Sequence, residues 1–190
     1  MNDYELLKEV GRSDKPVLLK RSFASTYKEW LLAAEYILKE GNHNVILCER
    51  GIRGFDSETR NVLDLQAVAV AKKLCALPVI VDPSHASGRD DIIEPMSLAA
   101  MISGADGLEI EAHTTPKDSP SDASQTITLE ALDEILNKSI NGSGYNEKYG
   151  VLGSNLSTES SVKLFPRDCD KFVMELQAEL KKRTGKHIEC

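Results

Sequence analysis

The chain has 190 residues, of which 41% are hydrophobic and 28% are charged, a composition typical of a globular protein with a buried core. Its formal net charge of −7 argues against binding to nucleic acid through a broad basic face. No apolar run reaches the roughly 18 residues that a membrane span needs, and the N-terminal MNDYELLKEV lacks the layout of a signal peptide. We therefore expect a cytoplasmic protein without a membrane partner, whose widely separated cysteines are reduced.

Four short apolar runs predict buried parallel strands at residues 16–20, 44–48, 78–82 and 106–111. Helical patterns follow them over residues 27–40, 62–75 and 92–103, and from Thr128 onward. Thr26 and Glu29 have the spacing of a capping box, and Gly41 suits the end of the same helix. Repeated βα units predict an α/β fold, either an open doubly wound sheet or part of an eight-unit barrel.

The character of the sequence changes at Ser139, where a polar, glycine-rich stretch begins. An amphipathic pattern near residues 170–183 predicts a further helix. We therefore predict two parts: residues 1–138 hold the four βα units, and residues 139–190 form a linker and an appended helix.

Polar side chains follow every predicted strand. They are Lys20 and Arg21, then Glu49 and Arg50, then Asp82 and His85, and finally Glu111 and His113. A single charge at a strand end usually meets only solvent, but ligands of parallel sheets bind beyond the carboxyl ends of the strands. Guanidinium and ammonium groups match phosphate, whereas imidazole and carboxylate groups ligate metals. The combined pattern predicts a site for a phosphorylated anion beside a divalent metal.

Several motifs carry a resemblance to a known family. The stretches NVILCERGIRGF (44–55), TRNVLDL (59–65), LPVIVDPSHASGR (77–89) and GADGLEIEAH (104–113) resemble the last four βα units of the short, microbial 3-deoxy-7-phosphoheptulonate synthases. The resemblance runs through about residue 138 and implies an incomplete TIM (β/α)8 barrel. It also implies the condensation of phosphoenolpyruvate with erythrose 4-phosphate in the shikimate pathway of aromatic amino acid biosynthesis.

The resemblance assigns roles to individual residues. It implies that His85, Glu111 and Asp122 are ligands of a divalent metal ion such as Mn²⁺ or Fe²⁺, and that His85 and Lys20 take part in catalysis. The positions expected to bind phosphoenolpyruvate or to share its face of the site are Lys20, Arg21, Glu49, Arg50 and Arg89.

The sequence also departs from the family pattern. The family has a cysteine metal ligand and a catalytic lysine after its first two strands, and this chain has no counterpart of either. Cys48 belongs to the CERG motif, and we interpret it as a small buried apolar side chain. Ser22, Ala123 and Ser124 replace glycine or proline residues of the family. Four strands alone would leave two parallel edges exposed, which suggests self-association or a complementary half-barrel chain.

Other interpretations stay open at this point. The chain is either a synthase or an inactive fragment or chimeric product that at most binds metal or phosphoenolpyruvate. A synthase for another phosphorylated aldehyde is disfavoured by the combination of CERGIR and DPSHASGR. Residues 149–186 resemble an internal piece of a family related to glutamyl ligases of the deazaflavin coenzyme.

Overall fold

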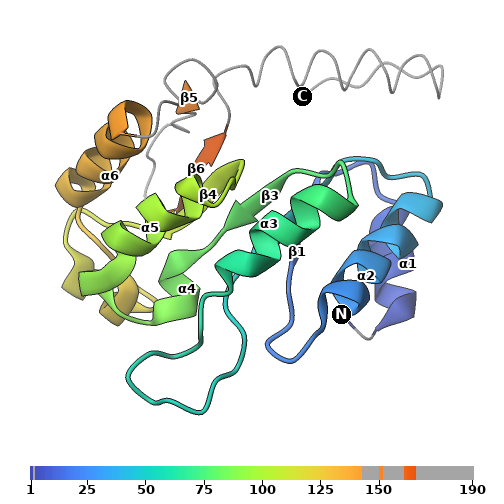
Figure 1. Cartoon of the computed structure of the whole chain (residues 1–190), viewed down its shortest axis with the longest axis horizontal. Coiled ribbons are helices and arrows are strands. Elements are labelled where there is room, and N and C mark those ends of the chain that lie inside the picture. Colours follow the sequence, from blue (N-terminus) through green and yellow to red (C-terminus); the bar gives the residue numbers. More distant parts are fainter. Residues whose placement is uncertain (2, 143–149, 152–160, 166–190) are drawn as a thin grey trace.

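A computed structural model describes residues 1, 3–142, 150–151 and 161–165, and Figure 1 labels its elements. The strands are β1 (Val17–Lys20), β2 (Val45–Glu49), β3 (Val79–Val81), β4 (Gly107–Glu111), β5 (Gly150–Val151) and β6 (Ser161–Phe165). The α-helices are α1 (Tyr4–Gly11), α2 (Tyr27–Lys39), α3 (Leu65–Leu74), α4 (Pro83–Ser87), α5 (Ile93–Ile102) and α6 (Leu129–Gly142). Short 3₁₀ turns are η1 (Asp90–Ile92), η2 (Pro116–Asp118) and η3 (Ala123–Gln125).

The four predicted strands form a parallel sheet in the order β1-β2-β3-β4, so each strand lies beside its neighbour in the chain. An open doubly wound sheet reverses its strand order at a switch point, whereas a (β/α)8 barrel keeps the strands in sequence. The observed order is therefore that of a barrel segment. The loops after β1, β2 and β3 all lie along the lower edge of the sheet in Figure 1.

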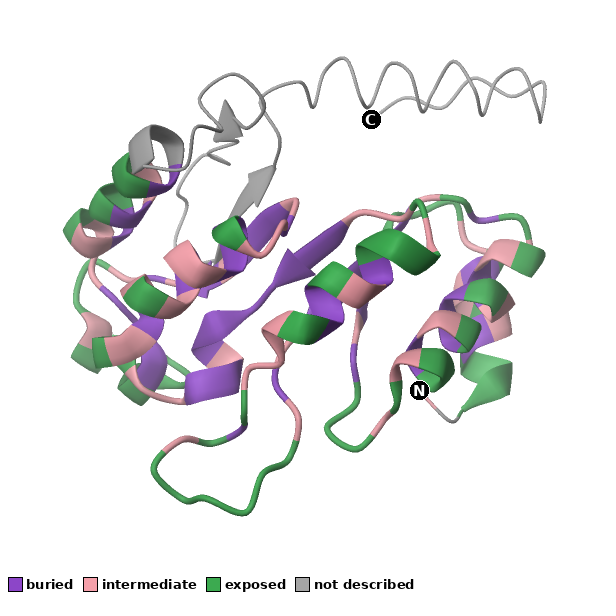
Figure 2. Ribbon diagram, viewed as in Figure 1, coloured by how far each residue is buried: buried purple, intermediate pink, exposed green. Residues whose placement is uncertain are grey.

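Helices α2, α3 and α5 cover one face of this sheet (Figure 1). Figure 2 shows the buried residues on the strands and on the sheet-facing sides of these helices. Trp30 and Ile37 of α2 and Val68 of α3 are completely buried there. The indole Nε1 of Trp30 also donates a hydrogen bond of 3.1 Å to the carbonyl of Leu19, which satisfies the polar end of a buried aromatic side chain. None of the described helices is long and apolar enough to cross a membrane.

The predicted boundaries of α2 are confirmed, but those of α3 need correction. Thr26 and Glu29 form the expected capping box, and Gly41 follows α2 with a φ of 103°. Helix α3 begins at Leu65, because the Asp64 side chain caps it, and not near residue 62. Leu74 is 64% exposed, since it lies in the last turn, beyond the buried contact made by Ala67, Val68 and Ala71.

One of the two sheet edges expected to be exposed has a partner. Strand β6 pairs with β4 in antiparallel orientation, with Leu108 opposite Leu164, so β4 does not present unpaired backbone groups along this stretch. Within the described residues, β1 pairs only with β2. Helix α6 continues to Gly142, past the expected boundary at residue 138, and the two-part division stays a prediction. The helix predicted near residues 170–183 lies outside the described residues.

The capping box of α2 predicts a measurable stability loss for Thr26→Ala. The Thr26 hydroxyl accepts a hydrogen bond of 3.2 Å from the Glu29 amide, and the Thr26 amide donates one of 2.8 Å back to the Glu29 carboxylate. Loss of an N-cap side chain costs about 1 kcal/mol, so urea denaturation should show the free energy of unfolding reduced by about that amount. The exposed Thr114 provides the control, because Thr114→Ala removes a similar hydroxyl outside any helix; equal effects of the two changes would contradict the cap assignment.

Candidate active site

The polar residues predicted at the strand ends all lie at the carboxyl edge of the sheet. Lys20, Glu49 and Glu111 are the last residues of β1, β2 and β4. His85 comes from α4, a short helix that directly follows β3. Asp122 precedes the 3₁₀ turn η3 in the segment after β4. Parallel strands thus bring together residues that are far apart in the sequence.

His85, Glu111 and Asp122 form a cluster suited to a metal ion. The Nε2 atom of His85 lies 3.0 Å from a Glu111 oxygen and 3.9 Å from an Asp122 oxygen. One potential ligand atom from each of the three residues lies within 4.8 Å of those of the other two. An imidazole nitrogen and two carboxylate oxygens are donors that manganese and iron accept, and the structure brings together the three ligands that the resemblance implied.

Glu111 also has a carboxylate oxygen that is free to accept a cation. Its second carboxylate oxygen, Oε2, is buried and has no hydrogen-bond partner. Burial raises the pKa of Glu111, and the negative charges of Asp122 and Asp82 raise it further, against the opposing effect of His85. A buried carboxylate oxygen without a donor is unfavourable unless a cation or solvent satisfies it. The donor set therefore fits a divalent metal.

Asp82 holds the other side of the His85 ring. One of its oxygens accepts the His85 backbone amide at 2.9 Å as the cap of α4, and the other lies 2.8 Å from His85 Nδ1. Although Nδ1 is not positioned for a straight hydrogen bond, this contact favours the proton on Nδ1 and leaves Nε2 free to ligate. The same contact raises the pKa of His85.

Asp82 itself is completely buried and links the histidine to a lysine. Its Oδ2 atom lies 3.1 Å from the ammonium group of Lys20, which also lies 3.0 Å from Glu109. Burial would raise the pKa of Asp82, but the hydrogen bonds from His85 and the charges of His85 and Lys20 outweigh it, so this pKa lies below its ordinary value. Lys20 is therefore held at the centre of the strand ends by two carboxylates.

A second group of potential ligands lies around Lys20. Cys48, Asp82 and Glu109 have ligand atoms within 4.8 Å of one another, but the Lys20 ammonium already forms ion pairs with both carboxylates. Burial raises the pKa of the Cys48 thiol well above its ordinary value, which disfavours the thiolate that a metal needs. The complete burial of Cys48 agrees with its interpretation as a small apolar side chain.

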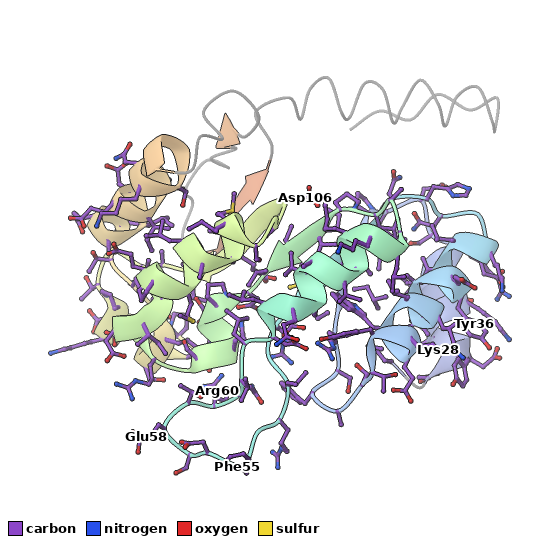
Figure 3. All side chains as sticks on the ribbon, in the orientation of Figure 1. Lys28, Tyr36, Phe55, Glu58, Arg60 and Asp106 are labelled. Carbon is purple, nitrogen blue, oxygen red and sulfur yellow. The ribbon has the colours of Figure 1, made fainter. Side chains whose placement is uncertain are left out.

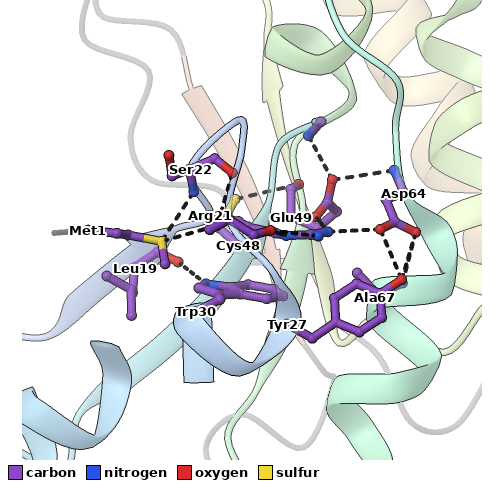
Figure 4. A network of polar contacts seen from close by, with 12 residues as sticks. Met1, Leu19, Arg21, Ser22, Tyr27, Trp30, Cys48, Glu49, Asp64 and Ala67 are labelled. Carbon is purple, nitrogen blue, oxygen red and sulfur yellow. Dashed lines mark hydrogen bonds and ion pairs between the residues drawn. The ribbon is translucent and has the colours of Figure 1, made fainter. Parts of the chain in front are cut away.

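Arg21 and Glu49 form a buried network (Figure 4). The Arg21 guanidinium lies 2.9 Å from both Glu49 and Asp64 and donates to the carbonyl of Ser25. It also lies 4.7 Å from the centre of the Tyr27 ring. These contacts use most of the guanidinium donors, so the network joins β1, β2 and the start of α3 as a structural element, and a substrate-binding role for its members stays a prediction.

Arg50 differs from Arg21 in having no acidic partner within the part of the chain that the structure describes. Its guanidinium lies 4.5 Å from the centre of the Phe23 ring, and its Nε atom is buried without a hydrogen bond. Among the described residues no carboxylate forms an ion pair with Arg50. A guanidinium held over an aromatic ring with unused donors is suited to bind a carboxylate or phosphate.

Arg89 lies beside a different set of groups. It forms ion pairs with Asp91 at 2.7 Å and with Glu58 at 3.7 Å, and it is about half exposed. These contacts direct the guanidinium to the loop between β2 and α3, so its assignment to the substrate site stays a prediction.

The sequence interpretation missed four contacts of the site: Asp82 with His85, Arg60 with Asp122, Gln125 beside Glu111, and Glu109 with Lys20. Period-two alternation in β4 places Glu109 on the same face as Glu111, a signal that could have identified it. Gln125 is fully buried, and its amide lowers the pKa of Glu111 although no contact of this amide reaches full hydrogen-bond geometry. No sequence pattern marks Gln125.

Comparisons with known proteins all identify relatives among the DAHP synthases and related aldolases. The model of the DAHP synthetase I family matches residues 1–143. The phospho-2-dehydro-3-deoxyheptonate aldolase of Thermotoga maritima is 47% identical over 134 residues, which cover 70% of this chain and 40% of that protein. The 2-dehydro-3-deoxyphosphooctonate aldolase of Agrobacterium fabrum is 33% identical over 111 residues, 53% of this chain and 38% of that protein.

Two solved structures are similar to the fold. A truncated form of the 3-deoxy-D-arabino-heptulosonate 7-phosphate synthase of Thermotoga maritima superimposes with a TM-score of 0.70 at 46% identity, covering 72% of this chain and 52% of that one. The crystal structure of the phospho-2-dehydro-3-deoxyheptonate aldolase of the same organism gives 0.71 at 46% identity, with 73% and 41% covered. The chain thus spans about half the length of these relatives or less, as an incomplete TIM barrel. By its sequence and fold, the chain belongs to the DAHP synthetase I family.

Proposed function

We propose that this chain provides the C-terminal half of the active site of a 3-deoxy-7-phosphoheptulonate synthase, which condenses phosphoenolpyruvate with erythrose 4-phosphate in the shikimate pathway. The observation that carries the proposal is the convergence of His85, Glu111 and Asp122 at the strand ends of a chain in this family. The cytoplasm is the expected compartment for this metabolism.

In this proposal His85, Glu111 and Asp122 hold a divalent ion such as Mn²⁺ or Fe²⁺. When bound, the ion polarises the aldehyde carbonyl as a Lewis acid. The chain's own contribution is to fix the ligands: Asp82 orients the His85 ring from the Nδ1 side, while His85 Nε2 and the Glu111 carboxylate face each other at 3.0 Å. Preorganised ligands of this kind need little rearrangement to accept a cation.

Arg50 and Lys20 provide the positive charge for phosphoenolpyruvate. Arg50 has unused donors beside the ring of Phe23. Lys20 donates to two carboxylates, but an ammonium group has three N–H donors, so one remains for an oxygen of the substrate. Asp82 contacts both Lys20 and His85, which supports an anion site next to the proposed metal site. Arg21, Glu49 and Arg89 support the same face of the site in this proposal.

The four-carbon aldehyde is favoured over the substrate of the related octulosonate enzymes. Identity to the heptulonate aldolase of Thermotoga maritima is 47%, against 33% for the octulosonate aldolase of Agrobacterium fabrum. Selectivity for one phosphorylated aldehyde over another depends on the groups around its hydroxyls and phosphate. The identity difference supports erythrose 4-phosphate as the substrate.

A second proposal is that the chain binds metal or phosphoenolpyruvate without turnover. It is favoured by the absence of counterparts to the family's cysteine ligand and catalytic lysine, and by the outer edge of β1, which lacks a second partner strand among the described residues. A complementary half-barrel chain would provide these two groups and cover this edge, whereas self-association would only cover the edge.

Activity of the purified chain with Mn²⁺, phosphoenolpyruvate and erythrose 4-phosphate separates the two proposals. Loss of enolpyruvate absorbance should report turnover, and His85→Ala should reduce the rate by at least about 100-fold, because a direct ligand of the metal is removed. Turnover unaffected by His85→Ala would contradict the proposed site. Absence of turnover combined with Mn²⁺ binding that His85→Ala abolishes would support binding alone.

The role of Asp82 predicts that Asp82→Asn weakens Mn²⁺ binding by about 10–100-fold, because an outer partner of a ligating histidine is lost. Asp82 raises the pKa of His85, and a protonated imidazole cannot ligate, so Mn²⁺ binding is lost as pH falls through this raised pKa. The substitution should move that loss to lower pH. Titrations followed by the electron paramagnetic resonance of free Mn²⁺ at several pH values would measure both effects.

The exposed Asp90 gives a matched control, since Asp90→Asn removes an equal charge away from the imidazole. An unchanged pH midpoint in Asp82→Asn would show that Asp82 does not control the protonation of His85.

A further inference from the structure

Of the three clustered ligands, Asp122 has the weakest local support. Glu111 ends a strand of the sheet, and His85 lies on a helix capped by Asp82. Asp122 instead lies in the segment after β4, outside any strand or α-helix, in a left-handed conformation with φ 50° and ψ 37°. Its side chain is 34% exposed and 3.9 Å from His85 Nε2. The position of this carboxylate therefore needs an additional constraint.

Arg60 provides a contact to this carboxylate. Its Nη2 atom donates a hydrogen bond of 3.2 Å to Asp122 Oδ1, which leaves the other oxygen, Oδ2, facing His85. A planar guanidinium with several fixed donors orients a carboxylate better than a flexible ammonium group does. Figure 3 shows Arg60 in the loop between β2 and α3, away from the exposed tip at Phe55.

The backbone of Arg60 is fixed to the segment that carries His85. The amide of Arg60 donates to the carbonyl of Ser87 at 2.9 Å, and the amide of the next residue, Asn61, donates to the carbonyl of Ala86 at 2.8 Å. The Asn61 side chain donates to the carbonyl of His85 itself at 3.3 Å. The backbone of Arg60 is therefore attached to the helix that carries His85, while its guanidinium contacts Asp122.

Gly88 leaves the space that the Arg60 side chain occupies. A Cβ atom at position 88 would lie 2.9 Å from Cβ and 3.1 Å from Nε of Arg60, too close for an unstrained contact. Gly88 also has a φ of 67° at the end of α4, a conformation that favours glycine. Because Gly88 has no side chain, the Arg60 side chain can pass across the end of α4 and contact Asp122.

We propose that Arg60 is a positioning residue that holds Asp122 in place as a ligand of the divalent metal. This inference rests on the proposed metal site and adds to it a residue from the loop after β2. The ion pair is substantially exposed, with 41% and 34% of the two side chains accessible, and such pairs contribute little to stability. The effect of Arg60 is therefore on the geometry of the ligand and not on folding.

Charge alone predicts the opposite effect of removing Arg60. A guanidinium near a cation site repels the cation, so its loss would tighten metal binding if repulsion were its main effect. If Arg60 positions Asp122, its loss should weaken binding, by about 10–100-fold as for other outer partners of metal ligands. The sign of the change in Mn²⁺ affinity thus separates the two roles.

The test is a double-mutant cycle on the full chain, with the dissociation constant for Mn²⁺ measured by electron paramagnetic resonance of the free ion. Arg60→Ala should weaken binding by about 10-fold or more and leave the thermal unfolding midpoint nearly unchanged. Arg60→Lys should recover part of the loss, because an ammonium group still provides a donor for Asp122 but lacks the planar geometry of a guanidinium. In an Asp122→Ala background, Arg60→Ala should cause no further weakening, since the two residues act through one contact.

The control is Arg53→Ala, which removes an exposed arginine from the same loop and should leave Mn²⁺ affinity within about twofold, the change expected from a distant surface charge. Unchanged or tighter binding in Arg60→Ala, or equal weakening with and without Asp122, would overturn the inference while the metal site stands. A wild-type chain that does not bind Mn²⁺ at all would overturn both the metal site and the inference.

Discussion

The buried carboxylate of Asp82 is the interaction on which the arrangement of the site depends. A carboxylate removed from water is costly unless donors and positive charge surround it. Here the backbone amide of His85, the His85 ring and the Lys20 ammonium lie around it. These compensating groups are also the residues with proposed chemical roles, so the stabilisation of one buried charge fixes His85 and Lys20 relative to each other.

A second buried network, formed by Arg21, Glu49 and Asp64, holds the start of the loop between β2 and α3. Arg21 follows Lys20 directly, but its guanidinium is enclosed by Glu49, Asp64 and the Tyr27 ring. Glu49 also accepts the backbone amide of Gly51, at the start of the loop that carries Arg60. The network therefore holds the entry to this loop, whereas the contacts of Arg60 and Asn61 hold its far end against α4. Two polar anchors define a loop whose tip, at Phe55, is fully exposed.

The barrel context explains why so many charged groups meet on one side of the sheet. The hydrophobic core lies between the strands and helices α2, α3 and α5. Side chains of alternate residues point to the other face of the sheet, which in a (β/α)8 barrel is the interior. Lys20, Cys48 and Glu109 point to this face, and each directly follows a buried leucine of the core in its strand. Strand β6 lies along β4, whereas β1 has no second partner strand among the described residues.

The sequence by itself determined the four βα units, the capping box at Thr26 and the three residues of the proposed metal cluster, because strand periodicity and cap chemistry are local and the motifs around His85 and Glu111 are specific. It also contained the signals for α4, since Asp82, Pro83 and Gly88 are a cap, a first-turn proline and a terminating glycine. Only the tertiary structure decided the strand order, the separate environments of Arg21 and Arg50, and the contact from Arg60 to Asp122 across 62 positions. Arginine residues such as Arg21, Arg50 and Arg60 cannot be distinguished by sequence alone. Their roles differ because folding determines which carboxylates lie within a few ångströms of each guanidinium.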